Sequence, residues 1–267
     1  MTADDTLGCV RAVLFDMDGL LIDSESIYTD VVNEVLRPYG KQQSWEIKSR
    51  LMGKPEREAT LTLLSSLWPP NRADPEDVAR GFGADCPLTL DEFLTQRNGR
   101  LLPAFEHVRP MPGAMRLVQH LHKHKIPMCI ATGSKRRNYE IKAGANADLF
   151  AGFEGRAVCG DDAATPRGKP HPDIFLAAAK HGLGLQDTEE ARAWLARLRD
   201  PGAEHDNTLR GAEKEVLVFE DALLVAVAEN RLPVNAHQTL ASLEEFRPEQ
   251  WGLPPFEEEG AEGPRAM

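Results

Sequence analysis

The sequence predicts an α/β protein with a parallel sheet and an all-helical domain inserted after the first strand. Short apolar runs typical of buried strands alternate with segments of helical periodicity, a pattern typical of parallel sheets. A long stretch with only helical periodicity, from residue 27 to residue 105, interrupts this alternation. We therefore expect this stretch to form a second domain within the α/β core.

Composition and charge exclude several classes of protein. A chain of 267 residues can bury a core in one large or two smaller domains. The net charge of −11 argues against a nucleic acid polymer as partner. The apolar runs are shorter than the roughly 20 residues needed to cross a bilayer, and the first five residues lack the basic, apolar pattern of a signal peptide. Four widely spaced cysteines indicate inert thiols and a reducing, cytoplasmic location.

Polar residues follow three of the expected strands at the point where each strand ends. The runs are 13–15, 127–131 and 215–219, followed by Asp16, by Thr132-Gly133-Ser134 and by Glu220-Asp221. In open parallel sheets, ligands bind outside the carboxyl ends of the strands. These three segments, with Lys169 at the start of a later helix, therefore predict one site.

The first of these strand ends contains two carboxylates two residues apart. Along a strand, residues i and i+2 point to the same face, so Asp16 and Asp18 could converge on one metal ion and one substrate. Gly19 gives the chain room to turn. In this arrangement Asp16 is placed to be a nucleophile that attacks phosphorus. Asp18 can protonate the leaving oxygen and later deprotonate the attacking water.

The remaining polar residues suit Mg²⁺ and a phosphate group. Mg²⁺ prefers oxygen ligands, which Asp16, the Asp18 backbone carbonyl and Asp221 would supply, with Glu220 binding directly or through water. The Thr132 hydroxyl and the N–H groups of Gly133 and Ser134 suit phosphate oxygens. Lys169 would offset the crowded negative charge and stabilise the transferring phosphoryl group.

The helical segment contains recognisable helix starts. Asp74-Pro75 has the pattern of an N-cap followed by proline, and Thr89 to Glu92 has the spacing of a capping box. Lys54, which follows Gly53, could reach an anionic substrate, although a surface lysine is the default interpretation. A later acidic pair, Asp161-Asp162, is interpreted as a solvated turn.

Four segments in order resemble the motifs of the haloacid dehalogenase-like hydrolase superfamily, in particular its phosphatases with a helical cap. They are FDMDG (15–19), ATGS (131–134), GKPHPDIF (168–175) and FED (219–221). The resemblance implies a Rossmann-like core from residues 10–26 and 106–257, a cap from 27–105 and a disordered tail at 258–267. It also implies Mg²⁺-dependent hydrolysis of a small phosphorylated metabolite, such as a nucleotide or sugar phosphate. A phosphomutase with the same chemistry stays open, as does the oligomeric state.

The chain departs from the family pattern after Asp221. The expected glycine is absent from residues 222–235, where Pro233 would also weaken a following strand. A long charged segment at residues 187–215 is interpreted as a surface insertion. These departures leave a second hypothesis, a weakened or inactive relative that binds a phosphorylated ligand or a partner without turnover.

Overall fold

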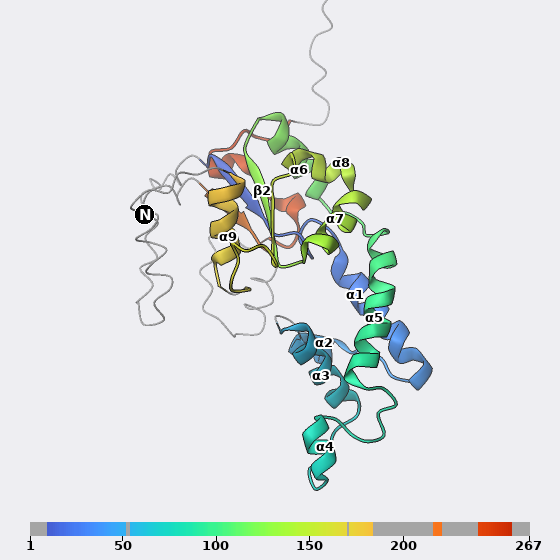
Figure 1. The fold of residues 1–267 in the computed structure, drawn as a ribbon. Coiled ribbons are helices and arrows are strands. Elements are labelled where there is room, and N and C mark those ends of the chain that lie inside the picture. The colour runs from blue at the N-terminus through green and yellow to red at the C-terminus, as the bar shows by residue number, and fades with distance from the viewer. Residues whose placement is uncertain (1–9, 52–53, 170, 184–215, 221–239, 258–267) are drawn as a thin grey trace, which may run out of the picture. The chain divides into compact units, whose positions relative to one another are not determined.

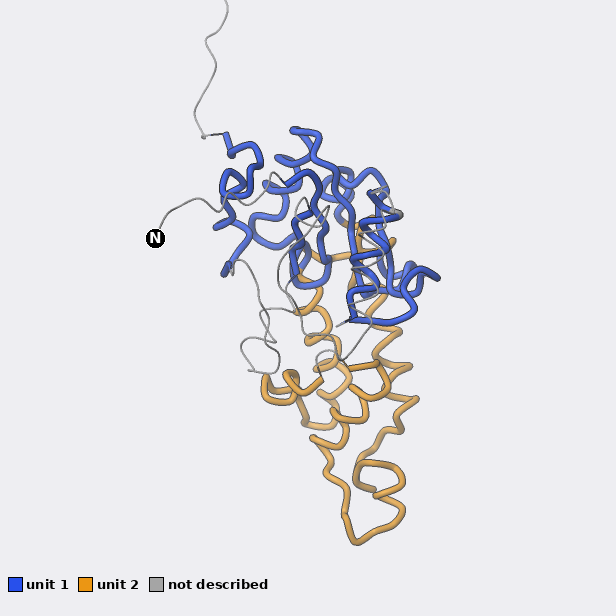
Figure 2. The backbone as a smooth tube through the Cα atoms, turned by 90° about the vertical axis from the view of Figure 1, so that its left-hand side faces the viewer, with its two compact units in different colours: residues 1–22, 110–139, 146–267 blue, residues 23–109, 140–145 orange. Residues whose placement is uncertain are grey.

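The computed structural model describes residues 10–51, 54–169, 171–183, 216–220 and 240–257 (Figure 1). The chain divides into two compact units (Figure 2). Unit 1 comprises residues 1–22, 110–139 and 146–267, and unit 2 comprises residues 23–109 and 140–145.

Unit 1 is built on a four-stranded parallel sheet with the order β3-β2-β1-β4. The strands are β1 (Ala12–Phe15), β2 (Met128–Thr132), β3 (Ala157–Cys159) and β4 (Val216–Phe219). Every residue of β1 and β2 is buried, as expected for strands covered on both faces. The prediction of an α/β fold with a parallel sheet is confirmed.

Helices lie on both faces of this sheet (Figure 1). On one face, Leu14 and Cys129 pack with Ile174 of α9 (Asp173–Ala177), which continues as a π-helix over Ala178–Gly182. On the other face lie α6 (Ala114–Lys123), α8 (Ala147–Phe150) and the 3-10 helix Ala151–Phe153. Phe15 meets the ring of Phe153 edge-on at 5.6 Å and stacks on Phe219 of β4 at 4.9 Å. The residue that precedes Asp16 is therefore held on this face by two aromatic contacts.

Unit 2 is helical in its described part. Its helices are α1 (Ser24–Leu36), α2 (Trp45–Leu51), α3 (Glu56–Leu67), α4 (Pro75–Arg80) and α5 (Leu90–Phe105), with a 3-10 helix at Arg37–Tyr39. The expected N-cap at Asp74 and the capping box from Thr89 to Glu92 are both present. A core of nine buried residues joins α1, α3 and the start of α5: Val32, Val35, Leu36, Leu63, Leu64, Trp68, Phe82, Leu88 and Phe93.

Several elements differ from the sequence-based expectation. β3 and α8 were not predicted. A helix was expected after the turn at residues 132–134 and is α7 (Arg136–Ala145), whose residues from 140 onward belong to unit 2. The expected helix from Pro172 to Lys180 begins at Asp173 and changes to π-helix from Ala178. The long insertion, the segment after Asp221 and the tail at 258–267 lie outside the described residues.

Two further expectations bear on the described residues. Their three cysteines, Cys86, Cys129 and Cys159, are free thiols. Burial raises the pKa of the Cys129 thiol to about 12, which keeps it protonated and unreactive at neutral pH. Within the described residues, the helices are too short or too polar to span a membrane.

The aromatic contacts of Phe15 generate a prediction about stability. Phe15→Ala removes a fully buried ring from the centre of the sheet, so we expect the free energy of unfolding to fall by about 3–5 kcal/mol. Urea denaturation measures the change. Val78→Ala, at a position 59% exposed on α4, is the control and should change it by less than about 0.5 kcal/mol. A Phe15→Ala loss no larger than that of the control would contradict the packing described here.

Candidate active site

Three neighbouring strands end at one edge of the sheet and carry the predicted site residues there. Asp16 directly follows β1, Thr132 is the last residue of β2, and Glu220 directly follows β4. Because β2, β1 and β4 are adjacent and parallel, their carboxyl ends lie side by side. The Asp16 backbone N–H donates to the Phe219 carbonyl at 2.9 Å, which extends the pairing of β1 with β4 up to the site.

Lys169 joins the carboxylates from two of these strand ends. Its Nζ donates to Asp16 Oδ1 at 2.7 Å and to Glu220 Oε2. The Asp16 and Glu220 side chains are only 6% and 7% exposed. Burial acts to lower the pKa of Lys169, but the charges of Asp16 and Glu220 outweigh it and raise the pKa above its ordinary value. Lys169 therefore stays protonated at neutral pH and neutralises part of the acidic cluster.

Contacts with α9 hold the loop that carries Lys169 and the Lys169 side chain itself. Arg167 donates to both carboxylate oxygens of Asp173, with Nε–Oδ2 at 2.9 Å and Nη2–Oδ1 at 2.6 Å. Asp173 is buried at the start of α9, so this bidentate pair ties the loop to a helix. The Lys169 ammonium also lies 5.0 Å from the centre of the Phe175 ring. Neither Arg167 nor Asp173 was among the site residues predicted from the sequence.

Asp18 belongs to a second hydrogen-bonded group. Its Oδ2 accepts the Ser134 hydroxyl at 2.7 Å and the Thr132 hydroxyl at 3.2 Å. The Thr132 oxygen in turn accepts the Ser134 backbone N–H at 3.1 Å. The chain turns directly after Asp18 at Gly19, whose φ of +81° lies in the region that favours glycine. The second aspartate is thus oriented by the end of β2.

Open space lies beside the turn that follows β2. Apart from the two chain neighbours of Gly133, no atom of the described residues would lie within 4 Å of a Cβ atom placed on it. The turn is residues 132–136, which we call the cradle turn, and it leads into the first residue of α7, Arg136. Its backbone therefore has room on the side of the Gly133 Cβ for a ligand such as a phosphate oxygen.

Six of the nine predicted site residues form two hydrogen-bonded groups of three. They are Asp16, Asp18, Thr132, Ser134, Lys169 and Glu220. Gly133 lies between two of them, and Asp221 lies outside the described residues. Lys54 belongs to unit 2, where its Nζ bonds Glu58 at 3.2 Å and Thr62 at 3.2 Å. Its contact with a substrate stays a prediction.

The donor set at this edge fits Mg²⁺. Asp16 and Glu220 bring hard carboxylate oxygens from adjacent strand ends to the same lysine nitrogen, and Mg²⁺ needs one or two carboxylates besides substrate phosphate and water. Within the described residues, no three histidine, cysteine or acidic side chains form a group that could hold a metal ion. The third predicted carboxylate, Asp221, lies outside those residues.

Comparison with known proteins places the chain in a family. A family model described as haloacid dehalogenase-like hydrolase matches residues 10–223. The chain belongs to this family. The matched region includes every segment from which the site is built, and the resemblance inferred from the four sequence motifs is confirmed.

Similar proteins have phosphatase names. The chain is 34% identical over 267 residues to (DL)-glycerol-3-phosphatase 2 of Arabidopsis thaliana, which covers 94% of this chain and 95% of the relative. It is 31% identical over 257 residues to a probable pseudouridine-5'-phosphatase of Drosophila melanogaster, covering 95% and 99% of the two chains. The crystal structure of a HAD hydrolase, family IA, variant 3, from Entamoeba histolytica matches with a TM-score of 0.57 at 18% identity, covering 91% of this chain and 98% of that one. The last match supports the fold.

The position of Lys169 generates a prediction with a definite pH dependence. Lys169→Met leaves Asp16 and Glu220 buried without their cation, so we expect a loss of about 3–5 kcal/mol in the free energy of unfolding at pH 8. Without the cation, the two buried negative charges repel each other, and binding a proton removes this repulsion in the folded variant. Protonation then favours the folded variant, and the loss should shrink as pH falls from 8 to 5.

Denaturant titrations in EDTA at both pH values measure this effect. Lys123→Met is the matched control, because Lys123 pairs with Glu257 in the same unit and both side chains are well exposed. We expect little change in the control at either pH. A Lys169→Met loss that is equal at pH 5 and pH 8 would contradict the described coupling.

Proposed function

We propose that the protein is a Mg²⁺-dependent phosphatase that hydrolyses a small phosphomonoester through an aspartyl-phosphate on Asp16. The observation that carries the proposal is that two aspartates after the same strand have different hydrogen-bond partners. Asp16 is bonded to Lys169, whereas Asp18 is bonded to hydroxyl groups at the end of β2. Membership of a hydrolase family with phosphatase relatives supports the same conclusion.

The first step of the proposed reaction is phosphoryl transfer to Asp16. A carboxylate oxygen of Asp16 attacks phosphorus, and the bond between phosphorus and the ester oxygen breaks. Asp18 gives its proton to the leaving oxygen, which departs as the alcohol. Lys169 lies within hydrogen-bond distance of the Asp16 carboxylate, so its charge is placed to stabilise negative charge on the transferring group.

The second step releases inorganic phosphate. Asp18, now a carboxylate, takes a proton from water as the water oxygen attacks phosphorus. The bond between phosphorus and the Asp16 oxygen breaks, which returns the Asp16 carboxylate. The hydroxyl groups of Thr132 and Ser134 hold Asp18 in one orientation through both steps.

The proposed metal ligands are Asp16, the Asp18 backbone carbonyl, Glu220 and Asp221. Mg²⁺ held by these residues would supply positive charge that offsets the negative charge of the phosphate oxygens. All four are oxygen ligands, which the ion prefers. The carboxylates of two of them, Asp16 and Glu220, bond the same lysine nitrogen.

The substrate is proposed to be a small phosphorylated metabolite. Names of similar proteins point to two compounds for a first assay, glycerol 3-phosphate and pseudouridine 5'-phosphate. The helical segment at residues 27–105 is proposed to act as a cap that selects among such substrates, with Lys54 as a candidate contact. A reducing, cytoplasmic location is proposed from the wide spacing of the four cysteines in the sequence.

The proposal predicts activity that requires Asp16. Purified protein with Mg²⁺ should release inorganic phosphate from at least one member of a panel of small phosphomonoesters. Asp16→Asn keeps the shape of the side chain but removes the nucleophile, so we expect turnover to fall at least about 10³-fold. EDTA should also abolish turnover, and added Mg²⁺ should restore it.

Two outcomes would separate this proposal from its alternatives. Turnover of the wild type no higher than that of Asp16→Asn across the panel would favour a relative that binds without catalysis. Transfer of the phosphoryl group to a second hydroxyl of a sugar phosphate, in place of phosphate release, would identify a phosphomutase.

A further inference from the structure

The turn after β3 lies directly against the cradle turn. The Gly160 backbone N–H donates to the Ser134 carbonyl at 3.0 Å. A Cβ atom on Gly160 would stand 2.4 Å from the Gly133 carbonyl oxygen, so the two backbones touch where a side chain would not fit. Residues 159–162, which we call the β3 turn, therefore support the cradle turn from the side of the Gly133 carbonyl.

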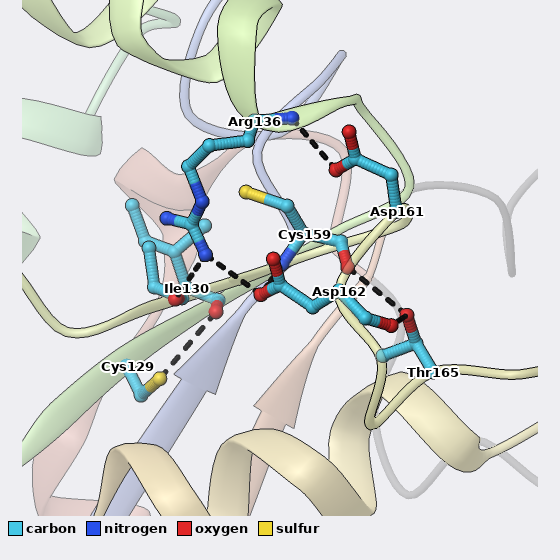
Figure 3. Close-up of polar contacts among 8 residues, drawn as sticks. Cys129, Ile130, Arg136, Cys159, Asp161, Asp162 and Thr165 are labelled. Carbon is cyan, nitrogen blue, oxygen red and sulfur yellow. Dashed lines mark hydrogen bonds and ion pairs between the residues drawn. The ribbon is translucent and has the colours of Figure 1, made fainter.

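Asp161 bonds the helix that begins at the cradle turn. Its Oδ1 accepts the backbone N–H of Arg136 at 2.8 Å (Figure 3). Arg136 is the first residue of α7 and lies two positions after Ser134. A carboxylate there satisfies one of the N–H groups that a helix start leaves without an intrahelical acceptor. The start of α7 is thus tied to the β3 turn through the backbone.

Asp162 makes the second connection through a single oxygen. Its Oδ2 accepts the Cys159 backbone N–H at 2.9 Å and the Arg136 Nη2 at 2.6 Å (Figure 3). The same Arg136 nitrogen also donates to the Ala157 carbonyl of β3 at 3.1 Å. The end of β3 and the start of α7 are therefore joined at one carboxylate oxygen.

The Thr165 side chain bonds two backbone carbonyls of the β3 turn. The buried Thr165 hydroxyl lies 3.0 Å from the Cys159 carbonyl and 2.8 Å from the Asp162 carbonyl. This contact holds the backbone of Asp162 while its side chain reaches Arg136 (Figure 3). The acidic pair that the sequence suggested to be a solvated turn is therefore a connection between two loops.

We propose that Asp162, acting through Arg136, is a positioning residue for the cradle turn. The inference rests on the proposed phosphatase function and deepens it. Ser134 must direct its hydroxyl to Asp18 and its backbone, with that of Gly133, toward the phosphate. The Asp162–Arg136 pair holds the chain two residues after Ser134, at the start of α7. Small errors in the placement of such groups reduce transition-state stabilisation strongly.

If the pair only stabilised the fold, its loss would lower catalysis no more than it lowers stability. The side chains of Arg136 and Asp162 are 37% and 30% exposed, and partly exposed ion pairs contribute little to stability. Loss of the pair should therefore change the melting temperature only slightly. If the pair positions the cradle turn, catalysis and affinity for a transition-state mimic should fall much further than stability.

The matched control is a similar pair near the opposite end of β2. Arg156 bonds the Glu154 carboxylate at 2.8 Å and the Met128 carbonyl at 2.9 Å, as Arg136 bonds Asp162 and the Ala157 carbonyl. Met128 is the first residue of β2, whereas the cradle turn begins at its last residue. Glu154→Gln therefore removes a comparable charge pair away from the proposed site.

The experiment compares Asp162→Asn with Glu154→Gln in the full chain, using the best substrate of the wild type. We expect Asp162→Asn to lower kcat/KM by about 10–100-fold and to raise the inhibition constant of orthovanadate by a similar factor, with kcat lowered more than KM is raised. Glu154→Gln should leave both within about twofold of wild type. Arg136→Lys keeps the charge, and its ammonium nitrogen can donate to both acceptors that one Arg136 nitrogen bonds, so kcat/KM should fall less than in Asp162→Asn.

The outcomes separate this inference from the function on which it rests. If the wild type is active and Asp162→Asn matches Glu154→Gln in kcat/KM and vanadate inhibition, the positioning role is wrong and the phosphatase function stands. If Asp162→Asn fails to fold, Arg136→Met, which removes the same ion pair, decides: unchanged vanadate inhibition overturns the inference. If the wild type hydrolyses no phosphomonoester, the proposed function fails and the positioning role with it.

Discussion

The ammonium group of Lys169 between Asp16 and Glu220 is the contact on which the site depends. Two buried carboxylates from adjacent strand ends bond the same nitrogen, and without a cation their buried charges would be left unpaired. Lys169 supplies that cation from a separate loop, which Arg167 and Asp173 hold to the start of α9. The negative charge of the site is in this way partly neutralised by a residue of the chain itself. In the proposed mechanism the same charge then acts on the phosphoryl group.

The parallel sheet explains why residues distant in sequence meet at this lysine. β1, β2 and β4 run in one direction and are adjacent, so each strand end delivers a polar residue to the same edge. Phe15 and Phe219, which precede Asp16 and Glu220, stack on each other below that edge. The packing of the sheet and the placement of the carboxylates are therefore consequences of the same register.

The sequence predicted the parts of the site that follow strong local patterns. Asp16, Asp18, Thr132 and Glu220 were found because each follows an apolar run long enough to indicate a buried strand. β3 was missed because Ala157–Cys159 is a run of mostly small residues that lacks bulky apolar side chains such as Leu14 and Phe15, and without that strand Asp161 and Asp162 resembled an ordinary acidic turn. Their contacts with Arg136, like that of Arg167 with Asp173, depend on tertiary packing that residue spacing does not encode.

The central claim is that Asp16 carries the phosphoryl group during the reaction. The most direct measurement is to quench the enzyme in acid during turnover of its best substrate and to locate covalent phosphate by peptide mass spectrometry. If Asp16 is the nucleophile, we expect phosphate on the peptide that contains Asp16. Hydroxylamine should remove it, as expected for an acyl phosphate. Steady turnover with phosphate on a different residue would contradict it.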